Sequence, residues 1–372
     1  MKLLVIGHSL IIDSNRKFWD VFAQKNNASV DLVAPLTWSS NLKSHIESVF
    51  NPATDSTLRK LILLPTFFKG NGSLFFFSPW GMFRTLNAER YDTIFLNQET
   101  WAMSTFWIIF LKIFSINREA KIFLCVAQNL KKENLKVLHP YERLISHFVY
   151  AFLYCSEEVK EVLRWKGIKN PCVYFPLPYD DQNYQRTLSS PYKDEFVLGY
   201  LGRLSEDKGI PVLIEACEKL KSKNINFKLL IGGNGPLVDF IKSKSYVEYL
   251  GLIPHNQAHK FYERIDCFIL PSQTKRNWKE QFGRVIVESF GAGKPVIGSS
   301  SGSIPEVLAK LNWPWIFRED SSEELAVMII KIMAELKTEE GIKNLKASVE
   351  LNYQRFSQTS VACELLSSFQ NT

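Results

Sequence analysis

The chain has 372 residues, enough for two domains of ordinary size, and its 46% hydrophobic and 22% charged residues exclude a disordered protein. The net charge of +7 is mild and no basic stripe is interleaved with aromatic residues, which disfavours a nucleic-acid partner. The six cysteines are scattered without a CxxC pair, which indicates reduced thiols and argues against a disulfide framework or a zinc site.

The first half of the chain is expected to form a parallel sheet with helices between its strands. Strands are predicted at Leu3–Ile6, Val30–Val33, Thr93–Leu96, Lys121–Cys125 and Phe152–Cys155. The opening apolar run is too short for a signal peptide and is predicted as a buried strand. The stretch Leu61 to Arg84, rich in Phe and small residues, has no assignable pattern.

The longest apolar block, Trp101 to Leu111, is too short to span a bilayer. We expect a core helix there, with an interfacial membrane contact as the alternative.

The second half alternates strands and helices more regularly. Strands are predicted at Phe196–Gly202, Phe227–Gly232, Val247–Leu250, Cys267–Leu270 and Pro295–Gly298. Helices are predicted at Pro211–Lys221, Pro236–Lys242 and Gln257–Ile265, at a start within Glu280–Glu288, and at Phe356–Phe369 near the C-terminus.

Prolines and polar residues without periodicity, from Phe175 through Pro191, predict a linker. The expected fold is therefore α/β, with two doubly wound Rossmann-like domains that face a cleft, covering residues 1–185 and 190–353.

Two carboxylates, Glu280 and Glu288, stand eight positions apart around a predicted helix start. Phe282 and Gly283 lie where the first backbone N–H groups of that helix have no helical partner and favour an anion. This arrangement suits a ligand with hydroxyl groups at both ends and an anionic middle, as in a nucleotide sugar. Two Glu residues at this spacing are often merely solvated, but a strand before them and a Gly-rich helix exit after them favour a site.

Gly202, Arg203 and Lys208 follow the first strand of the second domain, at the edge where ligands bind. Arg203 would hold a diphosphate by two parallel hydrogen bonds, and Lys208 would act on it as a point charge. The alternative is that both side chains are solvated, as such side chains on loops often are. The turn at Gly233 resembles a dinucleotide fingerprint only loosely, and a tight turn with close backbone approach is the favoured interpretation.

Polar groups also follow strands of the first domain. Gly7, His8 and Ser9 form a small loop that lets the backbone approach a phosphate. Glu99, Gln128 and Asn129 follow two later strands, where each could equally be a cap or turn residue. The sequence shows no Asp-x-Asp triplet and no metal-ligand spacing, so no metal is expected.

Taken together, these motifs resemble the retaining nucleotide-sugar glycosyltransferases of family 4, which have the GT-B fold. The matching segments are Gly199–Gly209, Ile231–Pro236, Leu250–Pro254, Leu270–Ser272, Glu280–Gly298 and Gly302–Val307. The resemblance implies that the last helix, residues 354–372, crosses back to the first domain. The family's linker motif has Gly where this chain has Pro178, and many relatives carry a His near Gln128 and Asn129.

The resemblance also implies roles for individual residues. Arg203 and Lys208 would grip the donor diphosphate, Glu280 would contact the donor sugar, and Glu288 would bind the ribose. Further donor positions implied by the same likeness are Gly7, His8, Ser9, Gly202, Gly233, Leu252, Ile253, Phe282, Gly283 and Arg284. Glu99, Gln128 and Asn129 resemble cleft positions of a subgroup that assembles bacterial polysaccharides.

The function that follows is a retaining, metal-independent hexosyltransferase. It would use a nucleotide sugar, with UDP as the favoured carrier, as co-substrate without any further cofactor, and a glycan or lipid-linked glycan as acceptor. A nucleotide-sugar epimerase of the same fold and a non-catalytic nucleotide-sugar-binding scaffold stay open as alternatives. A cytoplasmic location is expected, with peripheral contact at the inner membrane face left open.

Overall fold

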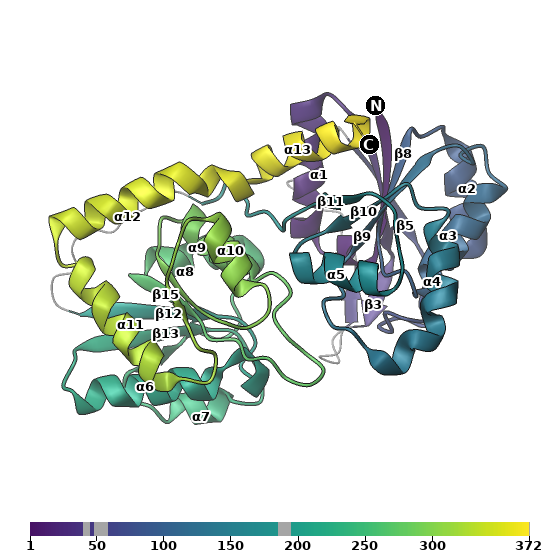
Figure 1. Ribbon diagram of the computed structural model, residues 1–372. Coiled ribbons are helices and arrows are strands. Elements are labelled where there is room, and N and C mark those ends of the chain that lie inside the picture. The colour runs from purple at the N-terminus through teal and green to yellow at the C-terminus, as the bar shows by residue number, and fades with distance from the viewer. Residues whose placement is uncertain (40–44, 48–58, 185–194, 372) are drawn as a thin grey trace. The chain divides into compact units, whose positions relative to one another are not determined.

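The computed structural model describes residues 1–39, 45–47, 59–184 and 195–371 (Figure 1). The chain divides into two compact units: unit 1 comprises Met1–Pro176 and Gln358–Thr372, and unit 2 comprises Leu177–Ser357. Part of the segment predicted as a linker, residues 185–191, lies outside the described residues.

Within the described residues, unit 1 is built on a parallel sheet of seven strands in the order β11-β10-β9-β8-β1-β2-β5. These strands are β1 (Lys2–Gly7), β2 (Ser29–Pro35), β5 (Arg59–Leu64), β8 (Thr93–Asn97), β9 (Lys121–Val126), β10 (Ala151–Tyr154) and β11 (Cys172–Tyr174). All five strands expected in this half are confirmed. The segment without an assignable pattern contributes β5, the hairpin β6 (Thr66–Phe67) and β7 (Phe76–Phe77), and the start of a helix; β3 (Thr37–Ser39) pairs with β4 (His45–Glu47).

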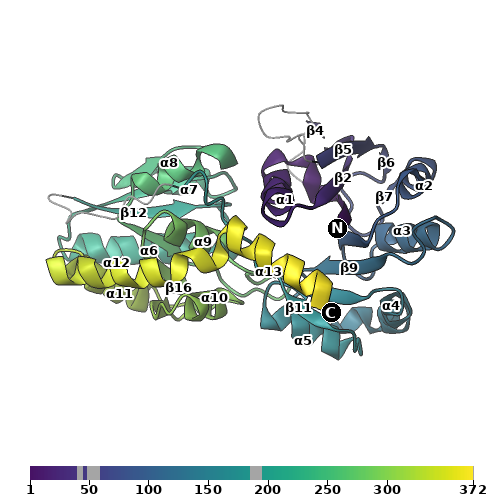
Figure 2. The same ribbon diagram turned by 90° about the horizontal axis from the view of Figure 1, so that it is seen from above.

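Helices cover both faces of this sheet. They are α1 (Asp13–Asn26), α2 (Pro79–Ala88), α3 (Met103–Ile113), α4 (His139–Ser146), α5 (Glu157–Trp165) and α13 (Gln358–Asn371), with short 3-10 turns η1 (His8–Ile11) and η2 (Glu133–Leu138). Figure 2 shows α1 and α13 on one side of the sheet and α2, α3 and α4 on the other.

The C-terminal helix α13 belongs to unit 1, which confirms the expected return of the chain. The ring of Phe369 packs against Phe123 of β9 and Phe22 of α1, with centroids 4.6 and 6.0 Å apart. The side chain of Asn26 donates from Nδ2 to the carbonyl oxygen of Ala362 at 3.1 Å. Burial of these aromatic groups closes the core on that face of the sheet.

Unit 2 contains, among its described residues, a parallel sheet of six strands in the order β14-β13-β12-β15-β16-β17. The strands are β12 (Phe196–Leu201), β13 (Phe227–Gly232), β14 (Val247–Tyr249), β15 (Cys267–Leu270), β16 (Val296–Ser299) and β17 (Ile316–Phe317). Five of them were expected from the sequence, because strands buried on both faces appear as short continuous apolar runs.

The helices of unit 2 connect these strands. They are α6 (Ile210–Ser222), α7 (Val238–Lys242), α8 (Ala258–Glu263), α9 (Arg284–Gly291), α10 (Ile304–Lys310), α11 (Ser322–Glu335) and α12 (Glu339–Asn352), with 3-10 turns η3 (Glu206–Lys208), η4 (His255–Gln257) and η5 (Tyr353–Phe356). Within the described part of the chain, none of the helices is both long and apolar enough to cross a membrane. The confirmed fold is therefore two doubly wound α/β units.

The start of unit 2 lies earlier than the expected boundary at 185–190. Tyr179 donates its backbone N–H to the carbonyl oxygen of Phe356 at 3.0 Å, and its ring lies against Gly291 of α9. The ring of Tyr184 packs on that of Tyr262, with centroids 5.8 Å apart. These contacts bind the proline-rich segment to unit 2, so its first residues do not act as a free linker.

The apolar block at residues 101–111 forms most of α3, but the expectation of a core helix is only half right. Ile108 and Ile109 are buried against the sheet, whereas Phe106 and Phe110 are 38% and 41% exposed. The helix therefore packs with one face and presents a second apolar face outward.

Candidate functional site

The sheet of unit 2 reverses its winding between β12 and β15, which lie side by side in the middle of the sheet. Loops that leave the carboxyl ends of strands at such a switch point commonly form the ligand site of a doubly wound sheet. Lys208 lies in the loop after β12, and Glu280 lies in the loop between β15 and α9. The sheet topology thus brings together two side chains that are 72 positions apart.

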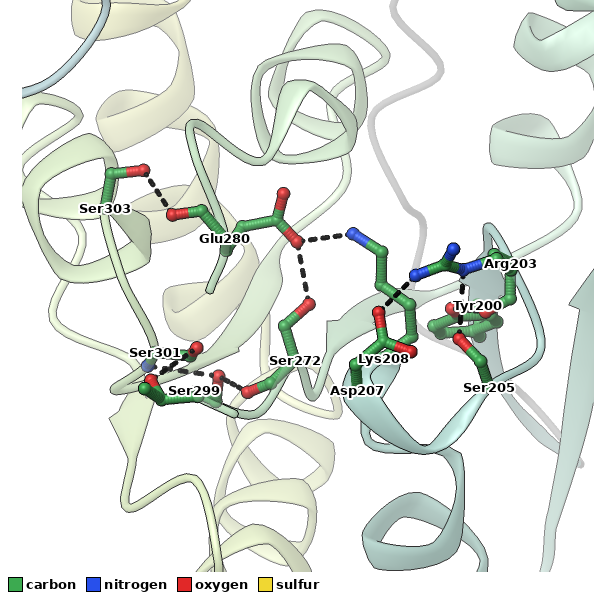
Figure 3. A network of polar contacts seen from close by, with 11 residues as sticks. Tyr200, Arg203, Ser205, Asp207, Lys208, Ser272, Glu280, Ser299, Ser301 and Ser303 are labelled. Atoms are coloured by element: carbon green, nitrogen blue, oxygen red, sulfur yellow. Dashed lines mark hydrogen bonds and ion pairs between the residues drawn. The ribbon is translucent and has the colours of Figure 1, made fainter. Parts of the chain in front are cut away.

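Glu280 is the centre of a compact polar cluster at this edge (Figure 3). Its Oε2 accepts hydrogen bonds from Lys208 Nζ at 2.7 Å and from Ser272 Oγ at 2.8 Å. The carboxyl group is largely buried, and Ser272 is fully buried at the end of β15. A buried carboxylate with these two donors is held in one orientation.

The backbone of Glu280 is fixed as firmly as its side chain. Its carbonyl oxygen accepts from the N–H of Ser303 at 3.1 Å and from Ser303 Oγ at 3.2 Å. Gly302 makes this approach possible, since a Cβ there would lie 2.1 Å from the same oxygen and the residue has φ of 53°. The loop after β16 therefore holds the backbone of Glu280 in place.

A second glycine brings Lys208 to the cluster. Gly209 has φ of 70°, and a Cβ at this position would lie 1.7 Å from the carbonyl oxygen of Pro271. No other residue type allows the loop after β12 to approach the end of β15 so closely. Gly209 also precedes α6, so it sets where that helix begins.

The ring of Trp278 completes the surroundings of Lys208. The Nζ atom of Lys208 lies 4.5 Å from the centroid of this ring, a distance at which a cation is attracted by the aromatic face. No sequence pattern indicates Trp278, because the contact joins two different loops. Ser272, by contrast, directly follows a predicted strand and its Pro271, so the rule of strand ends could have found it.

Arg203 has partners within its own loop. Its guanidinium pairs with the carboxylate of Asp207, and its Nε donates to Ser205 Oγ at 3.1 Å. The carbonyl oxygen of Arg203 accepts from the hydroxyl of buried Tyr200 at 2.7 Å. Although partial burial acts in the opposite direction, hydrogen bonds from Ser205 and Arg203 lower the pKa of Asp207. Figure 3 shows Lys208 directed to Glu280 and Arg203 directed to Asp207.

Helix α9 begins at Arg284, with Gly283 as its N-cap at φ of 75°. The side chain of Phe282 is buried and packs against Phe356, so this residue presents only its backbone to a ligand. Arg284 donates from Nε to the carbonyl oxygen of Pro178 at 3.3 Å. The predicted helix start is therefore confirmed to within two residues, with Glu280 in the loop before it.

Glu288 lies inside α9 and is almost completely buried. Its Oε2 accepts from the hydroxyl of Tyr262 at 3.1 Å, and its Oε1 lies 3.9 Å from Nε of Arg284. Burial raises the pKa of Glu288, and the charge of Arg284 and the hydrogen bond from Tyr262 oppose this effect. Burial of a carboxylate lowers the stability of the folded state, and buried ionisable groups of this kind are common at functional sites.

The other donor positions predicted in unit 2 gather around neighbouring loops of the same edge. Gly202 donates its N–H to the carbonyl oxygen of Gly232 at 3.0 Å, and Gly233 donates to Gly251 at 2.7 Å. Ile253 packs against Gly232, while the side chain of Leu252 is 69% exposed.

In unit 1 the predicted loop after β1 lies at the corresponding switch point, between β1 and β8. Asn97 at the end of β8 donates from Nδ2 to Ser9 Oγ at 2.8 Å, and Gly7 lies against the Cβ of Asn97. His8 stacks on Trp38 with ring centroids 5.0 Å apart. Burial lowers the pKa of His8, although a hydrogen bond with Gln98 acts to raise it.

Glu99 and Gln128 also meet in unit 1, as their positions at the ends of β8 and β9 predict. Glu99 Oε1 accepts from the N–H groups of Ala127 and Gln128 at 2.9 and 3.0 Å. Burial raises the pKa of Glu99 against the effect of these hydrogen bonds. Asn129 is buried and donates from Nδ2 to Glu158 Oε2 at 3.3 Å.

The side chain of Gln128 belongs to a buried network that the sequence did not indicate. Its Oε1 accepts from Lys166 Nζ at 2.8 Å and from Trp101 Nε1 at 3.0 Å, and its Nε2 donates to the carbonyl oxygen of Leu130. Lys166 forms an ion pair with Glu142 at 2.6 Å, and both side chains are buried. The network fixes the loop that carries Gln128 and Asn129.

The edge of unit 2 thus combines a lysine and a carboxylate in the loops after two neighbouring strands with the start of α9, and a second carboxylate lies within that helix. The lysine and the N-terminus of α9 both favour an anion such as a diphosphate, because each carries positive charge at this edge of the sheet. The carboxylates of Glu280 and Glu288 accept hydrogen bonds from hydroxyl groups. The site is therefore chemically suited to an anionic ligand that carries hydroxyl groups.

Comparison with known proteins agrees with this description. Residues 181–347 match the sequence model of the family described as glycosyl transferases group 1. The chain is 29% identical over 46% of its length, and 44% of the relative, to the putative colanic acid biosynthesis glycosyltransferase WcaL of Escherichia coli. It is 27% identical over 59% of its length, and 56% of the relative, to the uncharacterized glycosyltransferase MJ1607 of Methanocaldococcus jannaschii.

These matches span about half the length of the curated relatives. The whole chain superposes on the structure of Alr3699/HepE from Anabaena, solved in complex with UDP, with a TM-score of 0.73, 16% identity and full coverage of both chains. It superposes on sucrose-phosphate synthase of Thermosynechococcus elongatus with a TM-score of 0.70 and 17% identity, over 100% of this chain and 98% of that one. Residues 181–347, which lie in unit 2, are therefore similar to the glycosyl transferases group 1 family, and the whole chain has the GT-B fold.

Proposed function

We propose that the chain transfers a hexosyl unit from a nucleoside diphosphate sugar to a hydroxyl group of a glycan or lipid-linked glycan during polysaccharide assembly. The observation that carries this proposal is the contact of Lys208 with Glu280 at the switch point of unit 2. It puts a cation suited to phosphate beside a carboxylate suited to sugar hydroxyls. UDP is the favoured carrier, since a structurally similar protein, HepE, was solved with UDP.

Each group has a distinct part in this reaction. Lys208 and the N-terminus of α9 stabilise the negative charge that grows on the diphosphate as it leaves. Glu280 accepts hydrogen bonds from the donor sugar and fixes its orientation, and Glu288 accepts from the ribose. Arg203 reaches the diphosphate only when it turns from Asp207, which makes it the less direct of the two predicted cations.

Retention of configuration and independence of a divalent ion are part of the same proposal. The bond from the anomeric carbon to the phosphate oxygen breaks as the acceptor oxygen forms its bond on the same face of the sugar. The departing phosphate oxygen takes the proton of the acceptor hydroxyl, so the nucleoside diphosphate leaves with it. Cationic side chains and helix N–H groups would supply the charge stabilisation that a metal supplies elsewhere.

The experiment is a thermal-shift panel of UDP-, GDP- and ADP-sugars, followed by transfer to candidate acceptors with the donor that stabilises the protein. Release of nucleotide that depends on an acceptor, unchanged by EDTA and with retained anomeric configuration by NMR, is the expected result. Change of the donor sugar with no acceptor present would indicate an epimerase. Stabilisation without turnover on any acceptor would indicate a scaffold, and either result overturns the proposal.

A further inference from the structure

The outward face of α3 carries a stripe of apolar side chains. Met103, Phe106, Phe110 and Ile113 are each 38–43% exposed and recur at spacings of three and four, which places them on one side of the helix. The opposite side, with Ile108 and Ile109, is buried on the sheet. A surface helix normally presents polar residues to water, so α3 has a second apolar face that unit 1 does not cover.

Ring contacts extend this stripe at both ends. The Phe110 centroid lies 6.0 Å from that of Phe106 and 5.2 Å from that of Phe114, which is 65% exposed. At the other end, Trp107 contacts Phe76 of the β6–β7 hairpin, and Phe76 stacks on Phe67. We name the exposed members of this continuous surface the aromatic ridge: Phe67, Phe68, Phe106, Phe110, Ile113 and Phe114.

A basic cavity adjoins the ridge at Phe114. It has a volume of about 920 Å³ and lies at the amino ends of the strands of unit 1, opposite the edge that holds the predicted site residues. Its lining includes Phe114 and the cationic side chains of Arg90, Arg118 and Lys121.

Cations outnumber carboxylates along this surface. Lys69 lies beside Phe68, and Arg84 is exposed on α2, which packs against α3. The side chains that line the cavity include three cations, Arg90, Arg118 and Lys121, and two carboxylates, Asp92 and Glu119, of which Glu119 pairs with Arg118 at 3.4 Å. An anionic partner therefore fits the charge of the ridge and the cavity.

We propose that the aromatic ridge and the basic cavity form a docking surface for an anionic lipid bilayer. Aromatic rings and aliphatic groups would enter the boundary between headgroups and acyl chains, while Arg90, Arg118 and Lys121 contact lipid phosphates in and around the cavity. With 11 residues, α3 cannot cross a bilayer and would lie flat in its surface. A bilayer is favoured over a protein partner because cations flank an aromatic surface at both ends, the pattern of interfacial helices. This surface is independent of the proposed reaction.

The test is flotation of the full chain with vesicles of phosphatidylcholine, and with vesicles in which phosphatidylglycerol replaces about a third of it. Wild type should float with the anionic vesicles and less with the neutral ones. The Phe110→Glu/Phe114→Glu variant should bind anionic vesicles at least about tenfold more weakly, because two carboxylates replace exposed apolar groups that would enter the bilayer. The Arg90→Ala/Arg118→Ala variant should lose the preference for anionic vesicles but keep the weaker binding.

Leu351→Glu is the control for placing a carboxylate elsewhere on the surface, since Leu351 is 78% exposed on α12 of unit 2 and the substitution adds one negative charge. Its vesicle binding should equal that of wild type. Circular dichroism and acceptor-free donor binding should be unchanged in all variants, which separates this proposal from the proposed reaction. Absence of wild-type binding, or a Phe110→Glu/Phe114→Glu variant that floats like wild type, overturns the inference. A wild-type dimer that this double variant dissociates would assign the ridge to self-association and overturn it as well.

Discussion

The Nζ atom of Lys208 lies 2.7 Å from Oε2 of Glu280, although the two residues come from loops after different strands. Each strand lies on one side of the point where the sheet of unit 2 reverses its winding. The pair links a phosphate-binding type of side chain to a hydroxyl-binding one. Their roles are therefore expected to be coupled, yet separable by ligands that contain only one of the two chemical groups.

Replacement of Glu280 should abolish most of the activity. The Glu280→Ala variant is expected to lose turnover by more than about 20-fold, because the carboxylate that orients the donor sugar is gone. Lys208 is partly exposed and can turn to water, so the fold should survive. Nucleotide release in a steady-state assay measures the loss, and Glu350→Ala on the exposed side of α12 is the control. Full activity of Glu280→Ala would remove the proposed role.

The close approach of the loop after β12 to β15 should be sensitive to a single methyl group. Gly209→Ala places a Cβ 1.7 Å from the carbonyl oxygen of Pro271, and the backbone has φ of 70°. We expect a loss of unfolding free energy of at least about 2 kcal/mol, together with a loss of donor binding. Urea unfolding measures the first and a nucleotide-sugar titration measures the second.

Gly251→Ala provides the matched control for that experiment. Gly251 has φ of 72°, almost the same as Gly209, but a Cβ there meets no atom within 4 Å. It should cost only the backbone strain, about 1 kcal/mol. Equal destabilisation by the two variants would show that the contact with Pro271 does not matter.

The acidic group of Glu288 should make stability depend on pH in a definite direction. Burial raises its pKa above the ordinary 4.5, so the folded state keeps the proton to higher pH than the unfolded chain. The stabilising contribution is complete below 4.5 and is lost as pH rises through the raised value. The Glu288→Gln variant has no ionisable group at this position. As pH rises through this window, the melting temperature of the variant should therefore increase relative to that of wild type.

Thermal unfolding of both proteins, from about pH 4 to about pH 7, measures this difference. Glu350→Gln should show no such trend. A constant difference between wild type and Glu288→Gln would contradict the assignment. The same variant should bind the donor less well, since the proposed ribose contact needs the carboxylate.

The sequence predicted the strands of unit 2 well, for a physical reason. A parallel strand covered by helices on both faces must be apolar throughout, and Cys267–Leu270 is such a run, found as β15 with the same bounds. Lys208 is selected because its loop follows the end of a strand, and Glu280 because it precedes a predicted helix start. Their mutual contact also requires that β12 and β15 be neighbours, and this is a property of topology and not of spacing.

Residues that support the site were harder to predict. Trp278 and Ser303 act on Lys208 and Glu280 from other loops, and no local pattern distinguishes them from ordinary loop residues. The outward face of α3 departs from the favoured expectation of a core helix for a related reason. An apolar helix indicates burial, but Phe106 and Phe110 show that composition does not tell whether both faces find a partner within the chain.

The buried ion pair of Lys166 with Glu142 offers a test of the loop that carries Gln128. Lys166→Met leaves a buried carboxylate without its cation and should cost about 3–5 kcal/mol of unfolding free energy. The double variant Lys166→Met/Glu142→Leu removes both charges and should recover most of that loss. Urea unfolding measures the free energy of unfolding of the single and the double variant. A double variant as unstable as Lys166→Met would show that the unpaired carboxylate does not explain the loss of stability.

The most direct test of the central claim is a calorimetric titration of three proteins with UDP and with the UDP-hexose chosen by the stability panel. Lys208→Met should lose at least about tenfold in affinity for both ligands, because both contain the diphosphate. Glu280→Gln should lose a similar factor for the UDP-hexose but bind UDP as wild type does. Equal losses for both ligands in Glu280→Gln, or unchanged affinity in Lys208→Met, would contradict the account.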